Sequence, residues 1–234
     1  MLGEKERVKN DKKSKIFVMP EIRQEFPSMR ILRFPATFWL IAINVLFFLI
    51  AIVISLFYPN FIDVVALKPS DVMHGKNLWT ILTSMFMHAG VFHLFANMIS
   101  LMFLGSFLEK IVGKKRFLWI YFISGIMGSV FYILFSNPNI PAVGASGAIF
   151  GIAGMLAVLT PKMPVYIMFI PIAMPMWFGV ILIMGVLWLL TISAGLPIGN
   201  TAHFGGLIVG LGYAAYLRHK HPHKTQMISN HFSR

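Results

Sequence analysis

The chain of 234 residues has no cysteine and few charged residues. Without cysteine it forms no disulfide, has no thiol nucleophile and cannot bind a metal ion through thiolates. Aspartate, glutamate, lysine and arginine make up 12% of the residues, whereas a soluble domain normally has about a quarter. Because 57% of the residues are also hydrophobic, the composition indicates a protein of the membrane.

Acidic residues are the scarcer charged kind, with 8 against 20 basic residues and a formal net charge of +12. Such a surplus can indicate binding to nucleic acid. Here the basic residues flank long apolar stretches, in the tails and in short loops, which is typical of anchoring on the cytoplasmic side of a membrane. We therefore expect the lipid bilayer as a partner and no nucleic acid.

Residues 1–36 lack the short apolar core and the small-residue cleavage site of a secretory signal peptide. They are polar, mixed in charge and interrupted by Pro20, Pro27 and Pro35. We interpret them as a basic cytoplasmic segment.

Four stretches without a charged residue follow, at 34–62, 77–108, 117–161 and 163–217. A membrane-spanning helix needs about 20 apolar residues, so the third and fourth stretches are long enough for two helices each. Turn-forming residues at 137–141 and 193–200 divide them. The sequence therefore predicts an all-α membrane protein with six transmembrane helices, at 37–58, 92–112, 115–136, 146–160, 165–192 and 201–218.

Two segments depart from a simple row of spanning helices. The fourth predicted helix is short, and we expect its first residues to lie below the membrane surface, shielded by protein. Residues 61–87 are neither apolar enough to span nor polar enough to leave the membrane surface. They are predicted to form an interfacial outer loop with partial helices.

The basic residues define an orientation. If the N-terminus is inside, 18 of the 20 basic residues lie on the inner side, and only Lys68 and Lys76 lie outside. The positive-inside rule then places both termini in the cytoplasm. We predict a cytoplasmic segment at 1–36, a six-helix core at 37–218 and a basic cytoplasmic tail at 219–234.

Polar residues inside membrane helices are expensive and are usually functional. His93 and Asn97 lie near the outer start of the second predicted helix, Ser146 begins the fourth, and His203 lies in the first turn of the sixth. All three helices run from outside to inside. The topology therefore predicts that these four residues share one depth, near the outer face.

Small residues provide a reason for lateral proximity. Gly147 and Gly151 form a G-x-x-x-G pattern on the fourth helix, and Gly206 and Gly210 form another on the sixth, on the face that carries His203. Such faces let two membrane helices approach closely. Ordinary helix packing also explains each pattern alone. If the two faces meet, His203 lies near Ser146.

This arrangement would permit acyl transfer. A serine hydroxyl needs an adjacent base to become an effective nucleophile, and a neutral imidazole can accept and return a proton near neutral pH. Ser146 is thus the candidate nucleophile and His203 the candidate base. The ring of His93, the amide of Asn97 and the backbone N–H of Ser146 are candidate donors to the oxyanion.

A third, acidic member of a triad is not expected. Glu109 falls at the inner end of the second helix, where we expect it to pair with nearby lysine or arginine. The other acids belong to the N-terminal segment or the outer loop and have no evident route to His203: Glu4, Glu6, Asp11, Glu21, Glu25, Asp63 and Asp71. The sequence therefore predicts a Ser–His dyad.

Three motifs, in order, resemble those of the rhomboid family. Residues 88–97 (HAGVFHLFAN) are similar to the family's H-x4-H-x3-N, residues 144–147 (GASG) to its G-x-S-G, and residues 202–210 (AHFGGLIVG) to its A-H-x-x-G-x-x-x-G. The resemblance covers roughly residues 37–217. It is not the soluble G-x-S-x-G elbow, because Ala148 occupies the last position.

The resemblance implies a rhomboid-like bundle of the prokaryotic six-helix type and an endopeptidase that needs no cofactor. Its substrates would be transmembrane proteins, cut near the outer membrane face. Glycines at four positions would support the site: Gly144, Gly147, Gly206 and Gly210. The location implied is a prokaryotic plasma membrane, crossed several times; the sequence favours no particular oligomeric state.

The same resemblance assigns further positions. Phe150 should stack against His203, and the loop 193–200 would cap the site. The fifth helix would be a lateral gate, with Pro171, Pro175, Trp177 and Phe178. One position departs from the family pattern: bacterial relatives often have Trp-Arg in the outer loop, where this chain has Trp79-Thr80, which affects how that loop is anchored.

Other interpretations stay open on the sequence alone. Ser146 could bond back to its own helix, and His93 and Asn97 could join helices. A catalytically inactive rhomboid-like escort factor would usually lack the serine or the histidine, and both are present. A small transporter would often have an intramembrane acid and an inverted repeat. His219, His221 and His223 could bind a metal but have no supporting ligands, so we expect no metal site.

Overall fold

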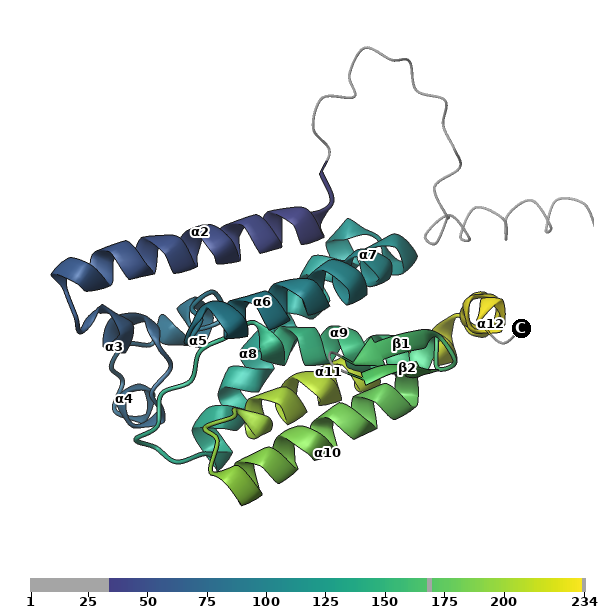
Figure 1. The fold of residues 1–234 in the computed structure, drawn as a ribbon. Helices are drawn as coiled ribbons and strands as arrows, with labels where there is room; N and C mark the ends of the chain where they lie inside the picture. Colours follow the sequence, from purple (N-terminus) through teal and green to yellow (C-terminus); the bar gives the residue numbers. More distant parts are fainter. Residues whose placement is uncertain (1–33, 168–169, 233–234) are drawn as a thin grey trace, which may run out of the picture. The chain divides into compact units, whose positions relative to one another are not determined.

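Helices form most of the described chain, residues 34–167 and 170–232 of a computed structural model (Figure 1). The long elements are α2 (Ala36–Phe57), α8 (Lys114–Phe135), α10 (Met176–Ala194) and α11 (Asn200–Lys220). The second predicted helix is α6 (Val91–Ser100), the π-helical turn η2 (Leu101–Gly105) and α7 (Ser106–Val112). The shorter elements are α3 (Phe61–Val65), α4 (Pro69–Met73), α5 (Thr80–Thr83), α9 (Ser146–Leu159), α12 (Pro222–His231), β1 (Pro164–Ile167) and β2 (Ile170–Pro175).

Four helical stretches of the described residues are long and apolar enough to cross a membrane: α2, the stretch Val91–Val112, α8 and α10. The helix α9 is apolar but has 14 residues. The helix α11 has 21 residues, but its asparagine, histidine and tyrosines and its several glycines dilute its apolar character. Most of the predicted segment 1–36 lies outside the described residues.

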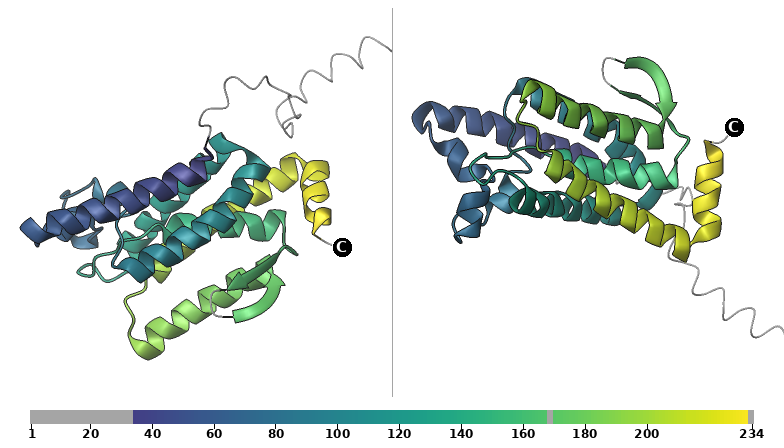
Figure 2. Two further views of the ribbon diagram at one scale, coloured as in Figure 1. Left: turned by 45° about the horizontal axis from the view of Figure 1, so that its top comes forward. Right: turned by 90° about the horizontal axis from the view of Figure 1, so that it is seen from below.

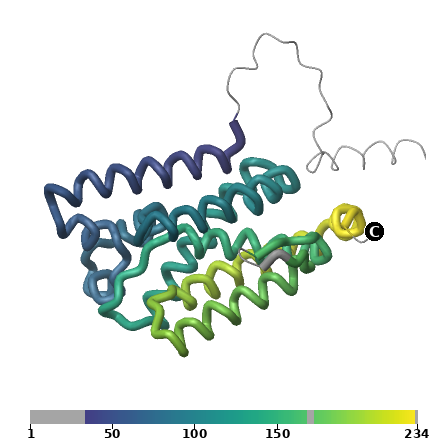
Figure 3. Tube along the Cα trace, viewed as in Figure 1, coloured from purple at the N-terminus to yellow at the C-terminus, as the bar shows by residue number. Residues whose placement is uncertain are grey.

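The short helix α9 is the centre of the packing. Most of its side chains are buried, including Ile152, Met155 and Leu156, and it contacts α8, α10 and α11. Figures 1 and 3 show α2 beside the α6–α7 stretch on one side of this centre and α10 on the other. A helix that is apolar on all faces is expected to be surrounded by other parts of the protein. The position of α9 among its neighbouring helices agrees with this.

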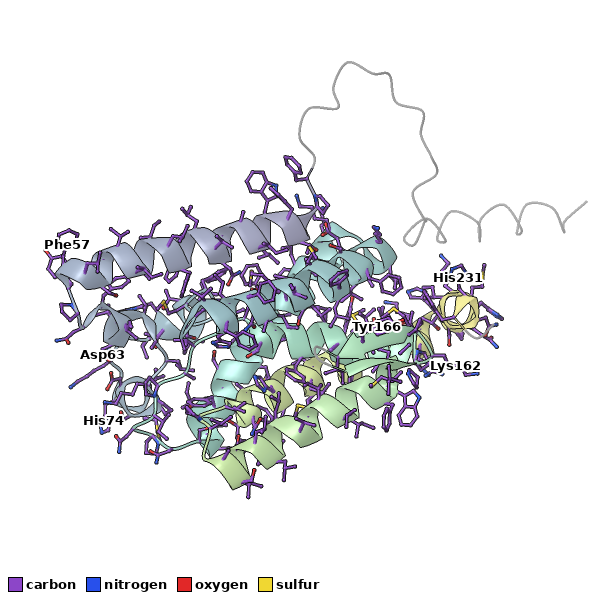
Figure 4. The ribbon with its side chains drawn as sticks, viewed as in Figure 1. Phe57, Asp63, His74, Lys162, Tyr166 and His231 are labelled. Carbon is purple, nitrogen blue, oxygen red and sulfur yellow. The ribbon has the colours of Figure 1, made fainter. Side chains whose placement is uncertain are left out.

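The helices alternate in direction along the chain. The segments α3, α4 and α5 lie at one end of the bundle, and the end of α9, the start of α10 and the helix α12 lie at the other (Figure 1). Figure 4 shows Asp63 and His74 at the first end and Lys162 and His231 at the second. Lys162 and the C-terminal tail with His231, both predicted to be cytoplasmic, therefore share one end of the described bundle.

The prediction of a helix over 165–192, and with it of an all-α fold, is wrong at its start. The strands β1 (Pro164–Ile167) and β2 (Ile170–Pro175) form an antiparallel pair there, in which Val165 pairs with Met174. Pro164, Pro171 and Pro175 explain the difference, because proline removes a helical hydrogen bond and clashes with the preceding turn. The helix α10 begins only at Met176, directly after Pro175. The fold is therefore mostly helical.

The outer loop is anchored without an arginine after Trp79. The indole Nε1 of Trp79 donates to the carbonyl of Val64 (2.8 Å), and the buried Thr80 hydroxyl donates to the carbonyl of Asn77 (2.7 Å). A pair of backbone hydrogen bonds between Leu67 and Ala142 joins the loop to the segment before α9. These bonds anchor the loop in this chain, which has threonine after Trp79.

Glu109 caps the start of α2, and within the described residues its partners are not the lysine or arginine that we expected. Its carboxylate accepts hydrogen bonds from the backbone N–H groups of Ala36 (2.7 Å) and Thr37 (2.9 Å) and from the Thr37 hydroxyl (2.8 Å). A carboxylate at a helix N-terminus satisfies unpaired donors and interacts favourably with the helix dipole. One side chain of α7 thus holds the first turn of α2.

Replacing Glu109 with alanine is expected to destabilise the protein by about 2–3 kcal/mol, since hydrogen bonds to a charged group contribute about that much and the donors would stay unpaired. Thermal unfolding in detergent micelles measures the change. Glu109→Gln should retain part of the stability, because its amide oxygen still accepts. Asp63→Ala, at the start of the short α3, is the matched control and should unfold as the parent does; equal losses at both positions would contradict the cap.

Candidate active site

Ser146 is the first residue of α9 and follows a tight turn. Gly144 has a φ of 128°, a backbone conformation that side-chain-bearing residues rarely adopt. Its N–H donates to the carbonyl of Ser84 (2.8 Å), and a Cβ on Gly144 would lie 2.9 Å from Cε1 of His93. The turn therefore needs glycine both for its conformation and for the imidazole packed against it.

His203 lies within hydrogen-bond reach of Ser146. Nε2 of His203 and Oγ of Ser146 are 2.8 Å apart, although the two residues are 57 positions apart in sequence. The histidine is buried, at 6% exposure, and its ring stacks on Phe150 with centroids 4.5 Å apart and an interplanar angle of 23°. The predicted stacking of Phe150 is thus present. With Nε2 accepting from the serine hydroxyl, the proton of the neutral ring is on Nδ1.

Nδ1 of His203 has no hydrogen-bond partner among the residues that the structure describes. An Asp or Glu at this position would orient the ring in a catalytic triad. Within residues 34–167 and 170–232, the stacking on Phe150 is the ring contact that restrains the imidazole instead. This geometry fits the predicted dyad.

Glycines bring α9 and α11 close enough for this hydrogen bond. A Cβ on Gly206 would overlap the carbonyl oxygen of Gly147, and a Cβ on Gly210 would overlap that of Gly151. Both predicted G-x-x-x-G faces therefore meet. Backbone contact at these two positions leaves no room for a methyl group, so the glycines set the distance between the helices that carry Ser146 and His203.

The two candidate oxyanion donors of α6 differ in their present contacts. The ring of His93 lies against Gly144, beside the serine. The amide of Asn97, at 5% exposure, donates to the carbonyl of His93 in its own helix (2.8 Å). The structure thus brings Ser146, His203 and His93 together, whereas the amide nitrogen of Asn97 would have to rotate away from its helix to serve an oxyanion.

Sequence reasoning gave no role to His88, which lies behind His93. It is 1% exposed, and its ring packs edge-on against that of His93 with centroids 5.2 Å apart. Burial, reinforced by the neighbouring His93, lowers the pKa of His88 to about 4. His88 is therefore neutral near pH 7 and supports His93 by packing. Ser84, whose carbonyl holds Gly144, was also missed, because a backbone role leaves no side-chain signal.

The tail histidines do not converge. Among the described residues, no group of three or more histidine, aspartate or glutamate side chains is placed to hold a metal ion. His219, His221 and His223 lie on α11, between the helices and on α12, respectively.

Buried polar side chains at the starts of two membrane-type helices, in a bundle with four membrane-length apolar stretches among its described residues, define a multi-pass integral membrane protein. A model of the rhomboid domain family matches residues 75–220, which is more than half of the chain. The chain therefore belongs to the rhomboid family.

Relatives with different activities are similar to it. RHOMBOID-like protein 1 of Arabidopsis thaliana is 37% identical over 166 residues, which are 69% of this chain and 40% of the relative. Inactive RHOMBOID-like protein 8 of the same plant is 45% identical over 93 residues, 39% of this chain and 26% of the relative. Rhomboid protease GluP of Bacillus subtilis (strain 168) is 32% identical over 155 residues, which are 64% of this chain and 28% of the relative. The chain thus spans less than half the length of these relatives.

Proposed function

We propose that this protein is an intramembrane serine endopeptidase that hydrolyses peptide bonds of transmembrane proteins with a Ser146–His203 dyad. The observation that carries the proposal is the 2.8 Å separation of Oγ of Ser146 and Nε2 of His203 at the starts of two closely packed helices. Similarity to a relative called a rhomboid protease supports it. The substrate class follows from the membrane location of the site.

Each group has a defined step. As Oγ of Ser146 attacks the scissile carbonyl carbon, Nε2 of His203 takes its proton. The imidazolium then gives that proton to the leaving amine nitrogen, which breaks the C–N bond and leaves an acyl ester on the serine. A water, deprotonated by the same Nε2, attacks the ester carbonyl and releases the acid and the serine hydroxyl. No acid or cofactor is needed for this proton balance.

The oxyanion of each tetrahedral intermediate would be stabilised from two sides. The backbone N–H of Ser146 belongs to the first turn of α9, where unpaired N–H groups and the positive end of the helix dipole favour negative charge. His93 donates from the opposite side, and Asn97 joins it once its amide leaves the carbonyl of residue 93. Such donors usually contribute more than any other single factor to acyl transfer.

We infer six membrane crossings, made by α2, the α6–α7 stretch, α8, α9, α10 and α11. The helices α9 and α11 would cross although they fall outside the four most apolar long stretches, because neighbouring helices shield their polar and glycine-rich faces. Both termini of the chain would then lie in the cytoplasm, on the side where the basic residues gather. The start of α9 would lie below the outer surface.

The helix α10 fits the lateral gate predicted for the fifth helix, now over Met176–Ala194. It is one of the least buried of the long helices, with Ile181, Leu189 and Ile192 largely exposed. Near its outer end, the amide of Asn200 donates to the Thr191 hydroxyl (2.8 Å) and joins it to the start of α11. The loop 193–200 would close the site above this bond.

Reconstitution tests the proposal. The purified protein is placed in liposomes with a fluorescent transmembrane substrate, and mass spectrometry locates any cut. We expect one or a few cuts near the outer end of the substrate's helix, absent with Ser146→Ala. Tight binding of several substrates without a cut would instead support an escort function, the second candidate, which the similarity to the inactive RHOMBOID-like protein 8 favours.

Asn97→Ala is expected to lower kcat by about 10²-fold with little change in KM, because an oxyanion donor acts in the transition state. Ser100→Ala is the matched control: its hydroxyl donates to the carbonyl of Ala96, one turn back in the same stretch, as the Asn97 amide does to that of His93. The control should keep the parent rate. Equal effects of the two substitutions would show that Asn97 acts only within its helix.

A further inference from the structure

We propose that the β1–β2 hairpin is a lipid-binding element that lies in the membrane interface on the Lys162 side and braces the inner half of α10. Its partner is the bilayer itself, at the level between the headgroups and the acyl chains. The inference rests on α10 crossing the membrane but not on catalysis. It can therefore hold or fail whether or not the protein cleaves a substrate.

The hairpin has the composition of a lipid-facing segment. Residues 163–175 contain no charged side chain, and the nearest charges are Lys162 before it and Arg218 far beyond it. The tyrosine hydroxyl of Tyr166 is the single side-chain hydrogen-bonding group in these residues. A connection exposed to cytoplasmic water would normally carry polar residues, because exposed apolar surface is unfavourable by about 25 cal/mol per Å².

The hairpin folds back beside α10 instead of extending away from the bundle, as Figure 1 and both views of Figure 2 show. Gly179, in the first turns of α10, makes the contact possible. A Cβ there would lie 2.9 Å from Cγ2 of Val165 and 3.7 Å from Cγ of Met174. The N–H of Met176 donates to the carbonyl of Met163 (2.9 Å) and closes the base of the hairpin against the helix.

Side chains of both described strands are exposed. Tyr166 is 72% exposed and Ile172 is 66% exposed. On the adjoining start of α10, Trp177 and Ile181 are also exposed, so the hairpin continues the apolar surface that a membrane-spanning α10 presents to lipid. Figure 4 places Tyr166 and Lys162 at the same end of the bundle. Lys162 marks the headgroup level, and the hairpin lies on its lipid side.

The depth is limited by the backbone. A hairpin of two strands leaves N–H and C=O groups unpaired along both outer edges, and such groups are costly in the hydrocarbon core. Three prolines, at 164, 171 and 175, remove some of these donors, while tyrosine and tryptophan favour the interface. Together these features indicate the interface, where water and headgroups can satisfy the edges, and exclude the centre of the bilayer.

A hairpin fixed in the membrane interface would restrict the movement of α10. Because the hairpin clamps the first turns of the helix and is itself held by lipid, displacement of α10 would be confined to its outer half. Among the described residues, the amide of Asn200 joins that half to the start of α11 by two hydrogen bonds, to the carbonyl of Leu187 (3.3 Å) and to the hydroxyl of Thr191 (2.8 Å). Substrate entry would then occur near Ser146 without dislodging the cytoplasmic end.

The absence of cysteine makes the test direct, because a single introduced cysteine is the only site for a thiol-reactive spin label. We would label Tyr166→Cys and, separately, Ile172→Cys in liposomes. Collision of the label with oxygen, which is concentrated in lipid, is compared with collision with a water-soluble nickel chelate. Leu46→Cys, on the exposed face of α2, is the reference for the bilayer core, and Gln226→Cys, exposed on α12, is the reference for water.

Both hairpin labels are expected to collide with the nickel chelate at least fivefold less often than the label at 226, and to read a depth shallower than that at 46. Nickel collision equal to that at 226 would overturn the proposal, because the hairpin would then lie in water. A depth equal to that at 46 would overturn the interfacial placement. Two label sites keep the test valid if one variant fails to fold, and neither reading depends on proteolysis.

Discussion

Replacing Ser146 or His203 with alanine is expected to lower the rate of substrate cleavage by about 10⁴-fold or more. The first change removes the atom that attacks the carbonyl, and the second removes the base 2.8 Å from it. Because both groups act in one proton transfer, the double variant should be hardly slower than either single one. Single-turnover cleavage in liposomes measures all three.

Two controls make this result specific. His223→Ala removes an exposed histidine of α12 and should leave the rate unchanged. Circular dichroism of the alanine variants should match the parent. Thermal unfolding should change little for Ser146→Ala and more for His203→Ala, because the histidine ring is buried against Phe150. Cleavage that survives Ser146→Ala would refute the nucleophile assignment, and a multiplicative loss in the double variant would refute the dyad.

Replacing Gly206 or Gly210 with alanine is expected to lower the free energy of unfolding by about 3 kcal/mol or more and cleavage by at least about 10²-fold. The added methyl would overlap a backbone carbonyl of α9, and backbone cannot yield as a flexible side chain can. Overpacking alone costs about 1–3 kcal/mol, and a displacement of about 1 Å at a catalytic pair can cost about 10²-fold in rate. Unfolding in detergent and cleavage in liposomes measure the two effects.

Gly212→Ala is the matched control on the same helix. A Cβ at Gly212 meets nothing within 4 Å. Because glycine is less favourable than alanine inside a helix by about 0.5–1 kcal/mol, this change should stabilise the protein slightly. If Gly206→Ala and Gly212→Ala behaved alike, the close approach of α9 and α11 would not be what positions His203.

The sequence predicted the convergence of Ser146 and His203 because two independent signals agreed. Hydropathy and charge fixed the direction of each helix and hence the depth of its first turn, and the glycine spacing identified the faces that meet. The stacking of Phe150 on His203 was predicted from family resemblance. The convergence of the two residues depends on helix periodicity and on chain direction, and both can be read from a sequence.

The hairpin was missed because its residues are uncharged and mostly apolar, like those of a membrane helix. Residues 164–175 are uncharged and mostly apolar and run directly into α10, so hydropathy could not separate the two segments, and Pro171 and Pro175 were assigned to a gate helix. The partner of Glu109 was missed for another reason. Its carboxylate accepts from backbone N–H groups at the start of α2, 72 and 73 positions away. Every residue other than proline has such a group, so the residue types do not identify the partner.

The side-chain orientation of Asn97 also could not be predicted from the sequence. The H-x3-N spacing places the two side chains on one helical face, but the amide can donate either to its own helix or toward the serine. In the structure it donates to the carbonyl of His93. Which bond it makes during the reaction depends on the charge of the intermediate, and the comparison of Asn97→Ala with Ser100→Ala is designed to detect that difference.

Covalent labelling of Ser146 tests the central claim most directly. A fluorophosphonate reagent forms a P–O bond with an activated serine oxygen and releases fluoride, and mass spectrometry of the digested protein locates the adduct. We predict an adduct on Ser146 in the parent, none on that peptide in Ser146→Ala, and labelling at least about 10²-fold slower in His203→Ala. An adduct on another serine, or equal labelling rates with and without His203, would contradict the assignment of the Ser146–His203 dyad.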